Sequence, residues 1–196
     1  MGPLVYVMGP SGAGKDSVMN RARAMLTPDA PVFFAHRYIT RPADTGGENH
    51  VALTAAEFAL RRDHGLFAFD WEAHGNRYGI GCEINTWRKS GLTVVVSGSR
   101  EHFLAADGLD EGTHPVLITA PAERLAARLA ARGREDDGAA AERLDRGTAY
   151  AIADSRLVTI VNDGALDAAA EAFVSLLARL RHAPAARRRA GSAPAR

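Results

Sequence analysis

The most informative segment of the sequence reads Gly9-Pro10-Ser11-Gly12-Ala13-Gly14-Lys15-Asp16-Ser17. It follows the apolar run 4–8, which predicts a buried strand, and it opens residues 15–26, which have the pattern of a helix. This context is typical of a phosphate-binding loop, because glycines let backbone N–H groups curl around anionic oxygens and the helix N-terminus adds positive charge. Lys15 is expected to reach the β- and γ-phosphates. We therefore predict that this segment binds the phosphates of a nucleotide.

The residue after the lysine departs from the usual pattern. Ser or Thr is expected there to hold Mg²⁺, whereas this chain has Asp16 followed by Ser17. Either Asp16 points away from the phosphates, or it joins Ser17 in the Mg²⁺ shell, directly or through water. We expect ATP with Mg²⁺ as the donor, and the loop alone does not exclude GTP.

Predicted strands and helices alternate along the rest of the chain. Strands are predicted at 4–8, 32–36, 92–97, 116–119 and 157–161, and a small β excursion at 66–70 and 77–80. Helices are predicted at 15–26, 54–65, 83–90, 121–132, 139–153 and 166–180. In the second of these, Thr54 and Glu57 have the spacing of a capping box. The alternation predicts an α/β fold with a central parallel sheet covered by helices on both faces.

Composition restricts the class of protein further. The chain has 196 residues, of which 46% are hydrophobic and 24% charged, which is enough for one domain with its own core. We place that domain at 1–182 and predict a disordered tail at 183–196. The net charge is only +1, and the last sixteen residues hold five arginines and no acid. The body is therefore net negative, which argues against a nucleic-acid binder.

The sequence also favours one compartment. It has no run of about 18 apolar residues, so we expect no membrane segment. Its N-terminus resembles the first strand of a fold rather than a signal peptide. Its single cysteine, Cys82, allows no intramolecular disulfide, so a cytoplasmic location is expected. The oligomeric state and the role of the basic tail stay open.

Several further segments, together with the loop, resemble the guanylate kinase group of nucleoside monophosphate kinases. The matching segments are Thr40-Arg41-Pro42, Gly47-Glu48, Gly75-Asn76-Arg77-Tyr78-Gly79, Arg128-Leu129, Arg132-Gly133, Arg143-Leu144 and Val161-Asn162-Asp163. The resemblance implies a P-loop kinase fold, an acceptor-binding region at 35–81 and a helical lid at 128–147. It also implies that Arg132 and Arg143, with Arg128 as a weaker candidate, close over the transferring phosphoryl group.

The departures from that group concern the residues that read guanine. Ile80 stands where a hydroxyl residue usually follows Tyr-Gly, and Ser97 ends the central strand where an acid is usual. Arg37 replaces a small hydroxyl residue, and Arg100 falls near the missing acid. Hydrogen-bonding groups for a base are thus exchanged for guanidinium groups, which suit phosphate. We expect an acceptor with no base and more than one phosphate.

This pattern resembles the ribose 1,5-bisphosphate phosphokinases of phosphonate catabolism. The resemblance rests on residues 36–44, 47–50 and 78–81 and on the Gly-Lys15-Asp16-Ser17 run. It implies ATP-dependent phosphorylation of ribose 1,5-bisphosphate to 5-phosphoribosyl 1-diphosphate, with Lys15 and the lid arginines as catalytic residues. The substrate-binding candidates are Arg37, Arg41, Glu48, His50, Tyr78 and Arg100.

Two other functions remain open. The first is a nucleoside monophosphate kinase, including a guanylate kinase with altered base-reading residues. The second is a non-catalytic binding module related to guanylate kinases, which the complete loop with Lys15 argues against.

Overall fold

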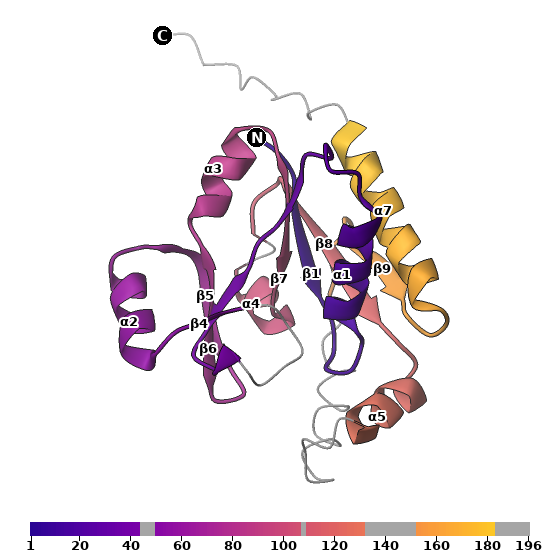
Figure 1. The fold of residues 1–196 in the computed structure, drawn as a ribbon, viewed down its shortest axis with the longest axis horizontal. Coiled ribbons are helices and arrows are strands. Elements are labelled where there is room, and N and C mark those ends of the chain that lie inside the picture. The colour runs from indigo at the N-terminus through magenta and orange to yellow at the C-terminus, as the bar shows by residue number, and fades with distance from the viewer. Residues whose placement is uncertain (44–49, 107–108, 132–151, 183–196) are drawn as a thin grey trace, which may run out of the picture.

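A five-stranded parallel sheet forms the centre of the protein (Figure 1). The computed structural model describes residues 1–43, 50–106, 109–131 and 152–182. The strands of this sheet lie in the order β2 (Val32–Phe34), β7 (Thr93–Ser97), β1 (Leu4–Met8), β8 (Thr113–Thr119) and β9 (Val158–Val161). All neighbouring strands are parallel. The predicted α/β fold with a central parallel sheet is confirmed.

Helices cover both faces of this sheet. Helices α1 (Lys15–Met25) and α7 (Leu166–His182) pack on one face, and α3 (Glu83–Lys89) and α4 (Arg100–Ala105) pack on the other. Helix α5 (Ala122–Ala131) follows β8 and packs Leu125 on the same side as α1. No helix of the described ranges is long and apolar enough to cross a membrane.

The side chains of β1 alternate between two hydrophobic cores. Val5 and Val7 pack with residues of α1 and α7 on one face. Leu4, Tyr6 and Met8 pack with residues of α3, α4 and β6 on the other. All five are at most 1% exposed. Because both faces of β1 are buried, the strand is a continuous apolar run, and its end holds the loop that follows in a fixed position.

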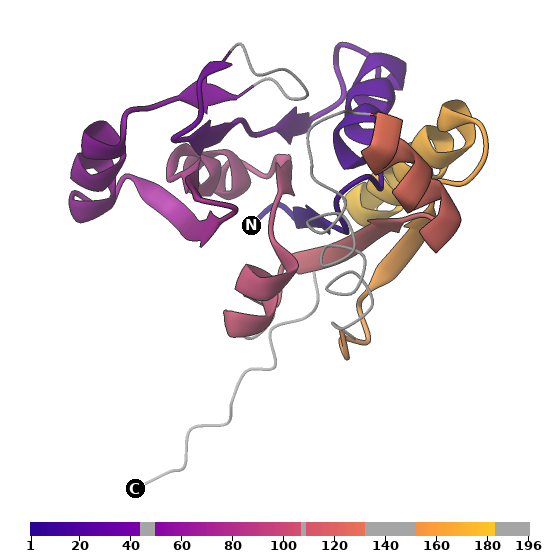
Figure 2. The ribbon, with the colours of Figure 1, turned by 90° about the horizontal axis from the view of Figure 1, so that it is seen from below.

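A second, four-stranded sheet lies to one side of the central sheet (Figures 1 and 2). Its strands lie in the order β4 (Val51–Ala52), β3 (Arg37–Ile39), β6 (Asn76–Gly81) and β5 (Phe67–Ala73). The β5–β6 pair is antiparallel, as the predicted β excursion requires. The helix of this region, α2 (Ala55–Asp63), begins after Thr54, whose hydroxyl accepts a hydrogen bond from the Glu57 N–H at 3.1 Å. The predicted capping residue is therefore confirmed.

Some boundaries differ from those predicted. The strand expected at 32–36 ends at Phe34, because the chain leaves the central sheet there and Arg37 pairs with Ile80 of β6 instead. Helix α4 was not predicted, since six residues are too few to show a periodic pattern. Nearly all of the helix expected at 139–153, and the tail at 183–196, lie outside the described residues.

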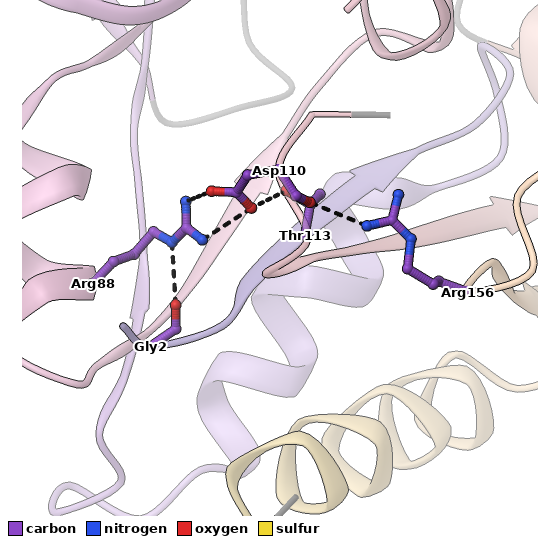
Figure 3. Close-up of polar contacts among 5 residues, drawn as sticks. All are labelled: Gly2, Arg88, Asp110, Thr113 and Arg156. Carbon is purple, nitrogen blue, oxygen red and sulfur yellow. Dashed lines mark hydrogen bonds and ion pairs between the residues drawn. The ribbon is translucent and has the colours of Figure 1, made fainter. Parts of the chain in front are cut away.

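A buried arginine ties together the N-terminus, α3 and the loop before β8 (Figure 3). The side chain of Arg88 is 4% exposed and donates to both carboxylate oxygens of Asp110, at 2.8 and 3.1 Å, and to the Gly2 carbonyl at 3.1 Å. Thr113 also donates to Asp110, at 2.8 Å. Burial raises the pKa of the Asp110 carboxyl, but the bonds from Arg88 and Thr113 outweigh it, so this pKa lies below its ordinary value.

We expect Arg88→Met to lower the free energy of unfolding by about 2 kcal/mol near neutral pH, because three hydrogen bonds are lost while the half-exposed Asp110 regains water. The loss is measured by urea unfolding, with the exposed Arg124→Met as control. Because the folded pKa of Asp110 is depressed, the pair stabilises above the unfolded value of 3.8 and its contribution disappears as the pH falls below that value. Equal urea midpoints for the two variants would contradict this prediction.

Candidate active site

The glycine-rich segment forms a loop between β1 and α1, at the carboxyl end of β1. Gly12 and Gly14 both have positive φ, of 82° and 79°, and Gly14 is the N-cap of α1. Gly14 has no side chain to cap the helix, so the first N–H groups of α1 are left for an anion. The structure therefore has the backbone geometry that the predicted phosphate-binding loop needs.

Lys15 folds back across this loop. Its Nζ donates to the carbonyl of Gly9 at 3.0 Å and to that of Pro10 at 3.2 Å. The ammonium group is thereby held beside the loop rather than in solvent. A phosphate bound at the α1 N-terminus would lie against a fixed positive charge.

Two side chains from later elements hold the outer side of the loop. The Asn162 amide is buried and its Nδ2 donates to the Ala13 carbonyl at 2.8 Å. The guanidinium of Arg128, on α5, donates to the Gly12 and Ala13 carbonyls, each at 3.4 Å, and to the Asn162 carbonyl at 3.0 Å. A Cβ at Gly14 would lie 2.6 Å from Asn162 Nδ2, so this close approach requires glycine. Both residues therefore hold the Gly12–Ala13 part of the loop in place. The predicted role of Arg128 in closing over the transferring phosphoryl group stays a prediction.

We expect Asn162→Ala to weaken nucleotide binding about tenfold while leaving the acceptor KM nearly unchanged, because the Ala13 carbonyl loses its buried partner and the loop loses its fixed shape. Titration with a fluorescent ATP analogue measures the effect, and Asn85→Ala on α3 is the control. An equal loss of affinity for donor and acceptor would show a general structural defect instead.

The acceptor candidates gather on the small sheet. Arg37 and Tyr78 lie on the paired strands β3 and β6, with the Arg37 guanidinium 5.3 Å from the centre of the Tyr78 ring. Trp71 of β5 stacks on the same ring at 5.5 Å. His50 is buried, and its Nε2 lies 3.0 Å from the carbonyl of Arg41, which is two residues past the end of β3. Four predicted acceptor residues from distant parts of the sequence are therefore brought into one region.

A pocket lies between α1, β2, β7 and the start of β3. It has an empty volume of about 450 Å³, part of it open to solvent, and its walls include Asp16 and Asn20 of α1, His36, Arg37 and Ser97. Asp16 lies in the first turn of α1, directly after the loop, and Arg37 begins β3, so the pocket brings together one candidate from each predicted site. Among the described residues, no three His, Cys, Asp or Glu side chains are grouped as a metal site.

The end of β7 is fixed by a buried tyrosine. The Tyr6 hydroxyl donates to the Ser99 carbonyl and accepts from the Ser99 N–H, both at 3.1 Å, and lies 3.0 Å from His102 Nδ1. Burial raises the pKa of Tyr6, and burial lowers the pKa of His102. Both groups are therefore neutral near pH 7. They hold the turn at Ser97–Ser99 in place without adding charge to the site.

Two relatives of this chain carry the same functional name. The chain is 53% identical over 177 residues to "Ribose 1,5-bisphosphate phosphokinase PhnN" of Desulfomicrobium baculatum, which covers 90% of this chain and 95% of the relative. It is 49% identical over 176 residues to the protein of the same name from Thiobacillus denitrificans, covering 90% and 93%. The chain belongs to the ribose 1,5-bisphosphate phosphokinase family. The family resemblance seen in the sequence is confirmed.

The fold of this family member is that of a guanylate kinase. The structure matches the crystal structure of guanylate kinase from Anaplasma phagocytophilum with a TM-score of 0.69 and 19% identity, covering 93% of this chain and 87% of that one. At this identity the likeness concerns the fold alone. No family model matches the chain.

The remaining predicted site residues are distributed as follows. Arg100 begins α4, immediately after the β7 turn, and therefore comes from a different element than the small sheet. Glu48, Arg132 and Arg143 lie outside the described residues, so their predicted roles stay predictions. Asn162 was indicated in the sequence only by the Val-Asn-Asp resemblance, and its contact with the loop depends on the pairing of β9 with β8.

Proposed function

We propose that this protein transfers the γ-phosphoryl group of ATP to the 1-phosphate of ribose 1,5-bisphosphate, which gives 5-phosphoribosyl 1-diphosphate and ADP. The observation that carries the proposal is the pocket shared by Asp16 of the donor loop and Arg37 of the acceptor sheet, in a chain about half identical to proteins named for this activity. In the proposed reaction, the Arg37 guanidinium would face the phosphates that are bound at the start of α1.

The acceptor in this reaction is a phosphate oxygen that is already anionic at neutral pH. It needs no general base, unlike a sugar hydroxyl. Catalysis then consists of positioning the two reactants and neutralising charge. Lys15 binds the donor phosphates, while Arg37 and Arg41 bind and orient the acceptor. Asp16 and the hydroxyl groups near it would hold Mg²⁺, and the ion would supply positive charge to offset that of the donor phosphates.

The acceptor side favours a sugar bisphosphate over a nucleotide. Ile80 is completely buried in the core beneath the small sheet, so it offers no polar group to a base. Arg37 of β3 pairs with Ile80 and brings a guanidinium group, which suits phosphate, beside this position. A guanidinium group donates hydrogen bonds and accepts none, so the N–H donors of a guanine edge would have no acceptor on Arg37, whereas the oxygens of a phosphate only accept.

The test is ADP release with Mg²⁺-ATP and either ribose 1,5-bisphosphate or GMP, corrected for ADP release without acceptor. We expect turnover with the sugar bisphosphate only, and a new diphosphate signal in the ³¹P spectrum. Turnover with GMP would overturn the proposal in favour of a nucleoside monophosphate kinase. ATP binding without turnover of either acceptor would indicate a binding module.

A further inference from the structure

The hydroxyl of Ser97, in the wall of the pocket described above, has no hydrogen-bond partner among the described residues. Ser97 is 6% exposed, and its Oγ forms no hydrogen bond with any described residue. It ends β7 beside β1, where it pairs with Val7, and it shares the pocket wall with Asp16. An unpartnered buried hydroxyl destabilises a protein, so its presence here indicates a ligand that supplies the missing bond.

The usual nucleotide-binding loop of this type holds Mg²⁺ with two groups. A Ser or Thr hydroxyl follows the loop lysine, and a carboxylate ends a neighbouring strand. This chain has a carboxylate, Asp16, after Lys15, and a hydroxyl, Ser97, at the end of the strand next to β1. The same two ligand types are present, with their positions exchanged.

We propose that Asp16 and Ser97 together hold the divalent cation that accompanies the donor nucleotide, with carboxylate and hydroxyl exchanged between α1 and β7. The inference rests on the proposed nucleotide-binding function. It assigns the metal to Asp16 rather than to Ser17, whose side chain is on the exposed part of the first turn of α1. The formal charge of the pair stays at the value of the usual arrangement, since one carboxylate is moved and none is added or lost.

Charge explains why the cation should enter with the nucleotide. Arg23 and Arg37 line the same pocket as Asp16, and their positive charges disfavour a bare cation. Mg²⁺ commonly takes one or two carboxylates and completes its shell with phosphate oxygens and water. A triphosphate at the loop would supply those oxygens and offset the two arginines. Without the metal, the Asp16 carboxylate and the triphosphate repel each other.

The position of Ser97 is well determined. The Gly98 N–H donates to the Val7 carbonyl at 2.8 Å, which extends the pairing of β7 with β1 past Ser97. A Cβ at Gly98 would lie 2.0 Å from the Tyr6 ring, so the chain is pressed against a fully buried side chain just beyond the hydroxyl. A short side chain on such a rigid strand end can hold a ligand with little loss of entropy.

The experiment measures Mn²⁺ binding by electron paramagnetic resonance, at a saturating concentration of the non-hydrolysable β,γ-imido analogue of ATP. We expect Asp16→Asn to raise the Mn²⁺ dissociation constant about 10- to 100-fold and Ser97→Ala to raise it about tenfold. Asp63→Asn on α2 and Ser175→Ala on α7 are the matched controls, because both residues are exposed and lie on elements that do not line the pocket. Thermal unfolding of every variant shows that it is folded, and Ser97→Ala should be no less stable than the original protein.

Two further measurements separate a metal ligand from a structural residue. In EDTA, Asp16→Asn should bind the nucleotide analogue more tightly than the original protein does, because the repulsion is gone, although it binds the Mn²⁺ complex more weakly. A structural defect would weaken binding of the analogue in EDTA as well as binding of its Mn²⁺ complex. The exchanged variant, with Asp16→Ser and Ser97→Asp combined, should bind Mn²⁺ more tightly than Asp16→Ser alone.

The proposal would be wrong if Asp16→Asn left the Mn²⁺ dissociation constant unchanged. If only Ser17→Ala raised that constant, the metal would be assigned to Ser17. A Ser97→Ala variant that changes only the KM of the acceptor would make Ser97 a sugar contact. If the original protein bound no nucleotide in EDTA or with Mn²⁺, the proposed function itself would be wrong, and the exchange would fail with it.

Discussion

Lys15→Ala should reduce kcat about 10³-fold or more while leaving the fold intact. The ammonium group is held at 3.0 and 3.2 Å from two loop carbonyls. We propose that from there it binds the donor phosphates and follows the charge that moves during transfer. Alanine removes this charge and leaves no other lysine near, because the chain has only Lys15 and Lys89. Steady-state ADP release with ribose 1,5-bisphosphate measures the loss.

Lys89 provides a matched control for this prediction. It lies exposed at the end of α3, so Lys89→Ala should turn over like the original protein. Acylation of lysines followed by mass spectrometry gives a second measurement, in which Mg²⁺-ATP should protect Lys15 and leave Lys89 reactive. Near-normal rates in Lys15→Ala, with an unchanged melting temperature, would contradict the assignment of the loop as the donor site.

Arg41→Ala should raise the KM of the acceptor about 10²-fold and change the KM of ATP little. A guanidinium that binds a phosphate through two charge-assisted hydrogen bonds contributes strongly when it is partly buried, and Arg41 is half-buried beside the small sheet. The buried His50 ring lies 3.0 Å from its carbonyl, which fixes the backbone at this position. Initial rates over a grid of both substrates separate the two KM values.

The control for Arg41 is Arg62→Ala on α2. Arg62 is exposed, and its ion pair is with its neighbour Asp63 at 3.6 Å. Arg62→Ala should therefore leave the KM of the acceptor and that of ATP unchanged, since an exposed ion pair of this kind contributes little to stability. If Arg41→Ala raised both KM values equally, or lowered the melting temperature strongly, Arg41 would be a structural residue rather than an acceptor ligand.

Local sequence determined most of the central fold. The apolar run Leu4–Met8 could only be a buried strand, and the glycines and lysine after it required a loop that bends backbone N–H groups inward before a helix begins. These signals are local, because each depends on residues within one strand, one turn or one helix start. The same holds for the Thr54 cap, where a hydroxyl and the N–H three residues later form a bond within one turn.

Short elements were decided by contacts across the chain. Strands β3 and β4 have three and two residues, too few for any alternation to show, and they exist because β6 and β3 offer them partners. The end of β2 at Phe34 has the same cause. Ser99 caps α4, because its hydroxyl accepts a hydrogen bond from the His102 N–H. This cap could be recognised only once β7 was known to end at Ser97.

For the site, the sequence determined the residue types, and the tertiary structure decided their neighbours. Lys15, Arg37 and Arg41 were found from motifs. The contact of Asn162 with Ala13 depends on the pairing of β9 with β8, and the pocket that Asp16 shares with Ser97 depends on the pairing of β7 with β1. The physical reason is range: backbone conformation and capping depend on adjacent residues, while a hydrogen bond between positions 149 residues apart depends on the packing of the whole sheet.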